Sequence, residues 1–232
     1  YSILDSALHM DSIIQMHSDV MDKTDEAKRI NLVVDEWGTW HASDPGTKPG
    51  FLQQQNALRD ALVASLHFDI FHRHCERVRM TNIAQTINVL QAMILTDGPK
   101  MVKTPTYWAF HLYACHHSAQ RVDLALHGVE EIGGEVKVPS ISATASRKDG
   151  AWHVSATCLD PNKGRTLHVT GLPAGAKLVE AKVLTADRMQ ACNTFDQPDL
   201  VKPAELMVKQ SGDLVEFETP PMSIVTIKFK EG

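Results

Sequence analysis

The sequence predicts an α/β region followed by an all-β region. Over residues 1–117, segments with apolar residues at helical spacing alternate with short β-branched runs. Over residues 118–232, short segments of alternating polar and apolar residues are separated by turns that contain Gly, Pro, Asn or Asp. Because the pattern changes from one kind to the other near residue 117, we expect a domain boundary there.

The first region opens with a helix, a strand and a second helix. Residues 2–21 carry a loose stripe of apolar side chains at helical spacing. Residues 30–36 form a β-branched run that ends in two acids, which is typical of a fully buried parallel strand with function at its carboxyl end. Residues 41–50 contain Asp-Pro-Gly and Pro-Gly and predict a loop. Residues 52–71 place leucine and isoleucine at four-residue steps and predict a long helix.

A second strand and two shorter helices complete the first region. We expect the strand over residues 78–83, a helix over residues 84–95 that Asp-Gly-Pro ends, and a last helix over residues 107–116. This order is typical of a (β/α) barrel or of an open α/β sheet. A complete barrel needs eight such units in roughly 250 residues, and the first region supplies about two of them. We therefore expect the missing units on upstream sequence.

The second region predicts an antiparallel β-sandwich. Strands of five to eight residues between turns rich in Gly, Pro and Asp are typical of two antiparallel sheets packed face to face. The alternating segments lie at residues 150–158, 165–171, 177–184, 214–218 and 223–230.

Composition and charge exclude several classes of protein. Hydrophobic residues make up 43% of the 232 residues and charged residues 22%, as in ordinary globular proteins. The net charge of −5 argues against a nucleic-acid partner, which requires a clustered basic face. No run of about 18 apolar residues occurs, so we expect no span of a membrane. The chain begins at Tyr1 in mid-pattern without a signal-peptide layout, so we expect part of a longer protein, whose localisation, cytoplasmic or periplasmic, stays open.

The sequence predicts neither a metal site nor a cofactor. The four cysteines form no Cys-x-x-Cys pair, and we expect free thiols. Gly-rich phosphate loops, a Gly-x-Ser-x-Gly elbow and a His-Glu-x-x-His motif do not occur. His67 and His74 can share a helix face, but a third ligand is lacking, so we expect packing or surface roles for them. We expect His116 and His117 at the frayed end of a helix.

The strongest candidate for a functional site is the Asp-Glu-Trp triplet at residues 35–37. A carboxylate at the carboxyl end of a buried strand lies where α/β barrels place their active sites. Trp37, Trp40 and His41 surround it with rings, which suit the C–H faces of sugars. The alternative is a structural acid that caps the next turn beside tryptophans of the core. The pattern alone leaves both interpretations open.

The segments around this triplet resemble a known family. Asn-Leu-Val-Val-Asp-Glu-Trp-Gly-Thr-Trp-His at residues 31–41 resembles the nucleophile strand of glycoside hydrolase family 51, the α-L-arabinofuranosidases. The resemblance extends from about residue 28 to the end of the chain. Further segments resemble that family in the same order along the chain, at residues 56–66, 80–89 with its Ala-Gln-x-x-Asn motif, 104–113, 192–201 and 220–227.

The resemblance implies both a fold and an activity. Residues 1–117 would be the C-terminal portion of a (β/α)8 TIM barrel, and residues 118–232 a jelly-roll-like β-sandwich. The implied activity is retaining hydrolysis of terminal α-L-arabinofuranosyl residues by two carboxyl groups about 5–5.5 Å apart, with Glu36 as the nucleophile. The acid/base Glu of the family follows an Asn, and no Asn-Glu pair occurs in this chain. We therefore expect that residue on the N-terminal part of the same enzyme.

The resemblance also implies the binding residues and the partners. By it, Gln85 contacts the bound sugar, and Trp37 and Trp40 are substrate-binding residues. Gly38 departs from the family, in which Asn is frequent after the tryptophan. We expect an arabinose-containing glycan and the N-terminal part of the enzyme as partners, a homo-oligomer, and neither a metal nor a cofactor.

Two other functions stay open from the sequence. One is a non-catalytic carbohydrate-binding or interaction module that works through the sandwich, but such a module does not need Glu36 beside Trp37. The other is a hydrolase of a related barrel clan that acts on another pentose or on a β-linked sugar. The Ala-Gln-x-x-Asn motif and the sandwich segments favour the arabinofuranosidase over that hydrolase.

Overall fold

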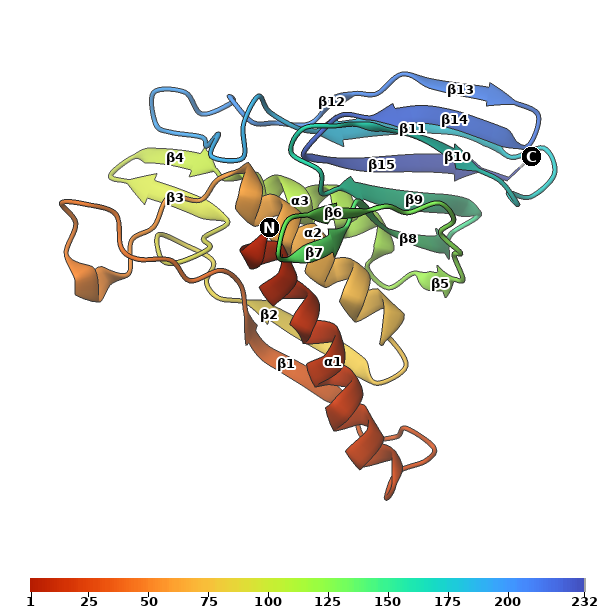
Figure 1. Ribbon diagram of the computed structural model, residues 1–232, viewed down its shortest axis with the longest axis horizontal. Coiled ribbons are helices and arrows are strands. Elements are labelled where there is room, and N and C mark those ends of the chain that lie inside the picture. The colour runs from red at the N-terminus through yellow and green to blue at the C-terminus, as the bar shows by residue number, and fades with distance from the viewer. Residues whose placement is uncertain (232) are drawn as a thin grey trace.

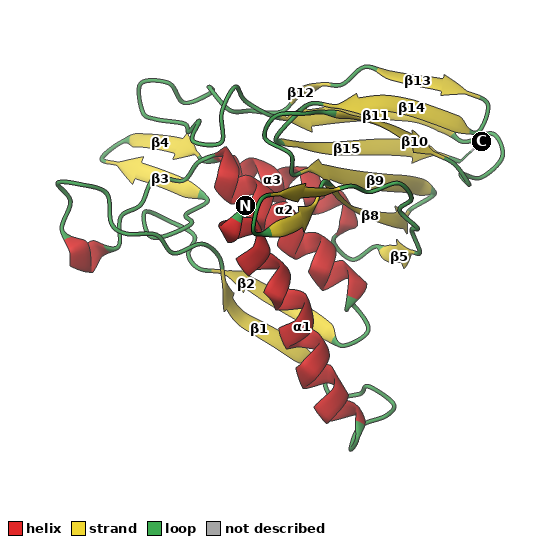
Figure 2. Cartoon of the chain, viewed as in Figure 1, coloured by secondary structure: helices red, strands yellow, loops and turns green. Residues whose placement is uncertain are grey.

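Helices lie between a small parallel sheet and two larger antiparallel sheets, and the N-terminal helix extends past the small sheet (Figure 1). This computed structural model describes residues 1–231, and Gly232, the last residue of the predicted second region, lies outside it. Helices and strands alternate over the first half of the chain, whereas strands predominate in the second half (Figure 2).

The first region contains all but one of the predicted helices and strands. Helix α1 (Ser2–Asp22) is followed by strand β1 (Leu32–Trp37), helix α2 (Leu58–Arg73), strand β2 (Val78–Ile83) and helix α3 (Pro105–Tyr113). β1 and β2 pair in parallel, as predicted for strands joined by a helix. α2 begins later than predicted, at a turn in which the Asp60 carboxylate accepts a hydrogen bond from the N–H of Ala57 at 2.8 Å.

The prediction of a helix over residues 84–95 is wrong. The segment is irregular up to strand β3 (Ile94–Asp97), which forms a hairpin with β4 (Lys100–Lys103). Asn88 has a φ of 59°, outside the right-handed helical region. Its Nδ2 donates to Thr96 Oγ1 at 2.9 Å, and its Oδ1 accepts from the Thr96 N–H at 2.7 Å. Such bonds from a side chain compete with helix formation, although the apolar content of the segment suits a helix.

Two antiparallel sheets form the second region, in agreement with the predicted sandwich. One has the strand order β12-β11-β15-β9-β8-β5 and the other β10-β14-β13. The five predicted strands are confirmed as β9 (Ala151–Cys158), β10 (Arg165–Val169), β11 (Lys177–Leu184), β14 (Leu214–Thr219) and β15 (Ser223–Lys230). The others are β5 (Gln120–Val122), β8 (Ile141–Lys148), β12 (Ala204–Glu205), β13 (Val208–Ser211) and a hairpin of β6 (Glu131–Gly133) with β7 (Lys137–Pro139).

The six-stranded sheet has an apolar face and a largely polar face. Its apolar face packs on the three-stranded sheet through Val154, Val225, Ile227 and Phe229, which meet Val215 and Phe217. Alternate residues of β8 and β9 face the helices, where Ser142 donates to Asp69 at 2.6 Å and Thr157 donates to Ser65 at 3.0 Å. α2 therefore lies on this sheet through hydrogen bonds as well as apolar contacts.

Strand β1 is less buried than the sequence predicts. Val33, Asp35 and Glu36 are exposed, whereas the β-branched run predicts a fully buried strand. The reason is that, within residues 1–231, β1 has a neighbouring strand on one edge only. Its other edge and one face meet solvent.

Candidate active site

Glu36 and Gln85 lie at the carboxyl ends of two neighbouring parallel strands. Glu36 is the second-to-last residue of β1. Gln85 comes shortly after the end of β2, and the peptide bond between Ala84 and Gln85 is cis. The ends are joined because Trp37 pairs with Ile83 and the Ala84 N–H donates to the Trp37 carbonyl at 2.9 Å. Both side chains are exposed. The structure thus brings a carboxylate and an amide to the same open end of the sheet.

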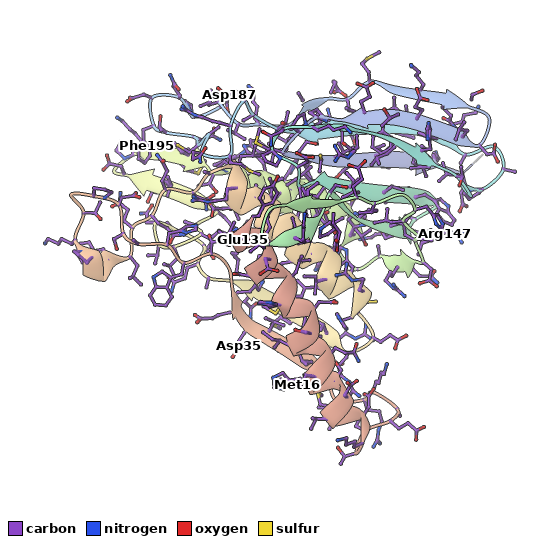
Figure 3. All side chains as sticks on the ribbon, viewed as in Figure 1. Met16, Asp35, Glu135, Arg147, Asp187 and Phe195 are labelled. Carbon is purple, nitrogen blue, oxygen red and sulfur yellow. The ribbon has the colours of Figure 1, made fainter. Side chains whose placement is uncertain are left out.

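Asp35 and Glu36 are adjacent near the end of β1, where the pairing with β2 is irregular between Val34 and Trp37. Figure 3 shows Asp35 beside the β1 ribbon, on the solvent side. Both carboxylates are exposed. A substitution of one can therefore serve as a control for a substitution of the other.

The Trp37 ring lies in the core and is only 4% exposed. It meets the rings of His67, Phe68 and Phe71 edge-on at centroid distances of 5.2 to 5.5 Å, and it stacks on Phe110 at 5.9 Å. This burial differs from the expectation that Trp37 binds substrate, because the ring has almost no surface left for a ligand. The ring instead anchors the end of β1 against α2 and α3.

The chain leaves β1 at Gly38, a position that favours glycine. Its φ of 145° is a conformation that residues with a side chain rarely adopt. A Cβ atom there would lie 3.2 Å from the Ala84 carbonyl oxygen and 3.2 Å from Gln91 Oε1. The turn lets the N–H of Thr39 donate to Gln91 Oε1 at 2.7 Å. The departure of Gly38 from the Asn frequent in the family therefore has a structural reason.

A buried carboxylate, Asp60, holds the loop that follows β1. The Thr39 hydroxyl donates to Asp60 Oδ1 at 2.8 Å, and His41 Nε2 lies 3.3 Å from the same oxygen. Burial acts to raise the pKa of Asp60, but the His41 hydrogen bond, the charge of Arg59 and the bonds from Ala57 and Thr39 outweigh it and lower that pKa. Asp60 is thus an anion that ties the loop to the start of α2.

Two glutamines extend this network, which the sequence analysis did not find. Gln54 accepts from the His41 N–H at 2.6 Å and donates to the Thr39 carbonyl at 3.0 Å. Gln91 donates to the Asp60 carbonyl at 2.7 Å. The only local signal is the position of Asp60 in the first turn of a helix, where a carboxylate accepts a backbone N–H. The glutamines give no signal, because their partners are distant in the sequence.

Trp40 differs from Trp37 in exposure, although both are close to Glu36 in the sequence. The Trp40 ring is 72% exposed, on the loop that Asp60 holds. An exposed ring offers a flat apolar face with a polar N–H at its edge, as sugar-binding sites require. Of the two tryptophans, only Trp40 has a face that a ligand can reach.

The histidines singled out in the sequence contact other side chains of the fold. The prediction that His116 lies at a frayed helix end is wrong. His67 is buried against Trp37, and burial lowers its pKa to about 4, against the opposing effect of a backbone hydrogen bond at Ala7. His74 Nε2 lies 2.8 Å from Asp11 Oδ1. His116 is buried rather than frayed, because Ser146 and Ser155 of the large sheet lie 2.7 and 2.8 Å from its two ring nitrogens.

Residues 1–231 contain neither a cluster of metal ligands nor a disulfide. Within that range, no group of three His, Cys, Asp or Glu side chains could hold a metal ion. Cys75, Cys115, Cys158 and Cys192 are all free. None of the helices in this range combines the length and the apolar character needed to cross a lipid bilayer.

Comparison with known proteins places these features in a family. Residues 35–223 match the family described as Alpha-L-arabinofuranosidase C-terminal domain. The chain is 40% identical to an intracellular exo-alpha-L-arabinofuranosidase from Bacteroides ovatus, over 99% of this chain and 45% of that protein. It is 25% identical to an intracellular exo-alpha-(1->5)-L-arabinofuranosidase from Bifidobacterium longum, over 97% of this chain and 46% of that protein.

Solved structures agree with the sequence relatives. The GH51 arabinofuranosidase from Xanthomonas axonopodis pv. citri aligns with a TM-score of 0.92 and 49% identity, over 97% of this chain and 46% of that one. A family 51 alpha-L-arabinofuranosidase from Bifidobacterium longum aligns with a TM-score of 0.84 and 27% identity, over 97% and 48%. The chain thus spans about half the length of the relatives that it matches. By sequence and by fold, this chain belongs to the α-L-arabinofuranosidase C-terminal domain family.

Proposed function

We propose that this chain is the C-terminal part of a retaining α-L-arabinofuranosidase and that it supplies the nucleophile, Glu36. The observation that carries the proposal is the exposed position of Glu36 at the carboxyl end of β1, next to the end of β2. Barrel enzymes hold their catalytic groups at this end of the strands. The family of the chain and the names of its relatives support the substrate class, which is a glycan with terminal arabinofuranosyl units.

β1 and β2 are, in this proposal, two strands of a (β/α)8 barrel that the N-terminal part of the same enzyme completes. Residues 1–117 are then the last portion of the barrel, and residues 118–232 the sandwich. The parallel pairing and the open edge of β1 support this arrangement. So do exposed apolar side chains that further barrel units would cover, namely Ile13, Met16 and Val20 of α1, Val33 of β1 and Met80 of β2.

Glu36 and an acid from the N-terminal part divide the reaction between them. A carboxylate oxygen of Glu36 bonds to the anomeric carbon while the bond to the leaving oxygen breaks, and a Glu of the N-terminal part protonates that oxygen. The same Glu then takes a proton from water. The resulting hydroxide adds to the anomeric carbon, releases Glu36 and gives arabinose of retained configuration.

The other residues of the site bind the sugar or position Glu36. The Gln85 amide both donates and accepts, so it can bond to sugar hydroxyls beside Glu36. The exposed ring of Trp40 stacks on the C–H face of a sugar. Trp37 acts as a positioning residue, because its buried ring holds the strand that carries Glu36.

Replacement of Glu36 by Ala in the complete enzyme tests the proposal. We expect turnover of an aryl α-L-arabinofuranoside to fall on the order of 10⁴-fold or more, because no glycosyl-enzyme intermediate forms without the carboxylate. Azide should restore part of the rate, since the small anion attacks from the side that Glu36 has vacated. The product is then an arabinofuranosyl azide of inverted configuration, which NMR identifies.

Asp35→Ala is the matched control, because it removes the neighbouring exposed carboxylate of β1. Its rate should not respond to azide. Near wild-type turnover by Glu36→Ala, or azide rescue of Asp35→Ala alone, would assign the nucleophile to another residue. A complete wild-type enzyme that binds arabinose-containing glycans but releases no arabinose would favour the carbohydrate-binding module.

A further inference from the structure

The two most exposed aromatic rings of residues 1–231 are both on the loop that follows Glu36. Trp40 is 72% exposed and Phe51 is 67% exposed, and the next is Tyr1 at 41%. Large aromatic side chains are usually buried, so two exposed rings on one loop indicate a surface that binds something. Their position on the loop that follows Glu36 favours the glycan over the barrel units that would cover α1, β1 and β2. The proposed active site uses Trp40 and leaves Phe51 without a role.

The part of the loop that carries Phe51 has a defined structure. Its base is closed by the Asp44 N–H, which donates to the Gln53 carbonyl at 2.8 Å, and by the Gln55 N–H, which donates to Asp44 Oδ1 at 3.1 Å. Its tip is a turn of 3-10 helix, η1 (Pro49–Phe51). The N–H of Phe51 donates to the Lys48 carbonyl at 2.9 Å. These bonds present the ring on a closed lobe, residues 44–53, rather than on a loose segment.

Phe51 forms a pair with a cation. The Lys48 ammonium lies over the Phe51 ring, 5.4 Å from its centroid. Because the ring stays 67% exposed beside this ammonium, a ligand can use both groups. A ring that meets C–H groups, next to a donor that meets oxygen atoms, matches the chemistry of a neutral sugar.

The lobe lies on the same side of the molecule as the carboxyl end of β1 (Figure 1). The loop leaves β1 directly after the site, and η1 lies at its outer end, far from the large sheets (Figure 1). The β3–β4 hairpin, which follows β2, projects toward the same side (Figure 1). A glycan bound at the end of β1 would therefore meet Trp40 first and the lobe farther along the same loop.

We propose that Phe51 and Lys48 form a subsite for the leaving-group part of the glycan, beyond the arabinofuranosyl unit that is released. The inference rests on the proposed function. An enzyme that releases terminal units places that unit at Glu36, so every additional sugar belongs to the leaving group. The subsite therefore selects chains of several sugars over small substrates, and it acts mainly on KM.

The test is Phe51→Ala in the complete enzyme, assayed on an aryl α-L-arabinofuranoside and on a linear arabino-oligosaccharide of several units. We expect kcat/KM on the oligosaccharide to fall about tenfold, which is typical for the loss of an aromatic contact, and mainly through KM. Turnover of the aryl substrate should stay within about twofold, because that substrate ends before the lobe. Phe51→Trp should keep the oligosaccharide activity, since it restores a ring.

Met207→Ala is the matched control, because this side chain is 89% exposed on the second region and should affect neither substrate. Equal losses on both substrates would overturn the subsite, since they indicate damage to the loop. Unchanged activity on both would overturn it as well, and so would a change in sedimentation that shows Phe51 to be a contact between subunits. A wild-type enzyme that does not hydrolyse the aryl substrate contradicts the proposed function itself, which distinguishes that failure from a failure of the subsite.

Discussion

At the scale of single residues, Gly38 joins the end of β1 to the segment that follows β2. Its φ of 145° and the 3.2 Å separation of a Cβ from the Ala84 carbonyl oxygen leave little room for a side chain. We expect Gly38→Ala to lower the free energy of unfolding of the complete enzyme by about 1–3 kcal/mol. It should also lower kcat, because the Thr39–Gln91 bond beside Glu36 must lengthen. Urea unfolding and the aryl arabinofuranoside assay measure the two effects.

Substitutions of two other glycines in the same loop distinguish backbone strain from steric crowding of an added Cβ atom. Gly46 has a φ of 82° but nothing within 4 Å of a Cβ, so Gly46→Ala should show strain alone. Gly50 lacks the positive φ and also has open space, so Gly50→Ala should leave stability nearly unchanged. If Gly38→Ala unfolds at the same urea concentration as Gly50→Ala, the turn at Gly38 does not need glycine.

At the scale of elements, α2 and the large sheet meet through buried titratable groups. Asp69 accepts bonds from Ser142 at 2.6 Å and from Tyr113 at 2.9 Å, and burial raises its pKa to about 7 in spite of them. Burial lowers the pKa of His72 to about 4. Burial, together with the nearby histidines His72 and His153, lowers the pKa of His116 to about 3. A change of pH therefore has two opposite effects on the stability of this interface.

The histidines and the aspartate have opposite signs in the pH dependence of stability. His72 and His116 bind fewer protons when folded, so their contribution to stability is lost as pH falls from 6.5 toward their folded pKa values. Asp69 binds more protons when folded, so its contribution is lost as pH rises from 3.8 toward about 7. Burial also lowers the pKa of His67 to about 4. The stability that the three histidines lose on acidification therefore exceeds the stability that Asp69 gains. We therefore expect acidification below pH 6.5 to destabilise the folded protein.

Replacement of His116 by Gln tests this balance. We expect the wild-type thermal midpoint to fall between about pH 7 and about pH 5, and His116→Gln to reduce that fall, because the amide bonds to a serine without titrating. Thermal unfolding at the two pH values measures it. His168→Gln is the control, since His168 is exposed on β10 beside Glu216. Equal pH dependence for wild type and His116→Gln would show that His116 does not titrate in this range.

At the scale of the whole molecule, the proposed reaction needs a second carboxyl group, which we expect on the N-terminal part of the enzyme. No Asn-Glu pair occurs in the sequence, and the end of β1 is open to solvent within residues 1–231. We expect the purified chain alone to release no aglycone from an aryl α-L-arabinofuranoside, because general acid–base help alone contributes roughly 10²–10⁴-fold. Robust turnover by the purified chain would contradict the proposal.

Addition of the N-terminal part of the enzyme provides the control for that assay. Activity should return when the two parts are combined, and it should not return when the chain carries Glu36→Ala. The homo-oligomer stays a prediction, which sedimentation of the complete enzyme checks.

Local patterns in the sequence were sufficient for most elements of the fold and for the centre of the candidate site. The apolar stripe of α1, the β-branched run of β1 and the alternation of β9 and β15 are regular over neighbouring residues, and all four elements are present. The same run places Glu36 at a strand end, so the position of this carboxylate follows from the sequence.

Only the tertiary structure decided the features whose partners are distant along the chain. Strand β8 has a sequence of small and polar residues after Ile141, and it is a strand because β9 pairs with it along its whole length. His116 is buried because serines of later strands meet it, and Trp37 turns into the core because rings of α2 and α3 surround it. The segment at 84–95 is irregular because its polar groups bond to strand β3 and to the loop after β1. Periodicity describes only near neighbours, whereas these donors, acceptors and rings come together only when the helices and sheets pack.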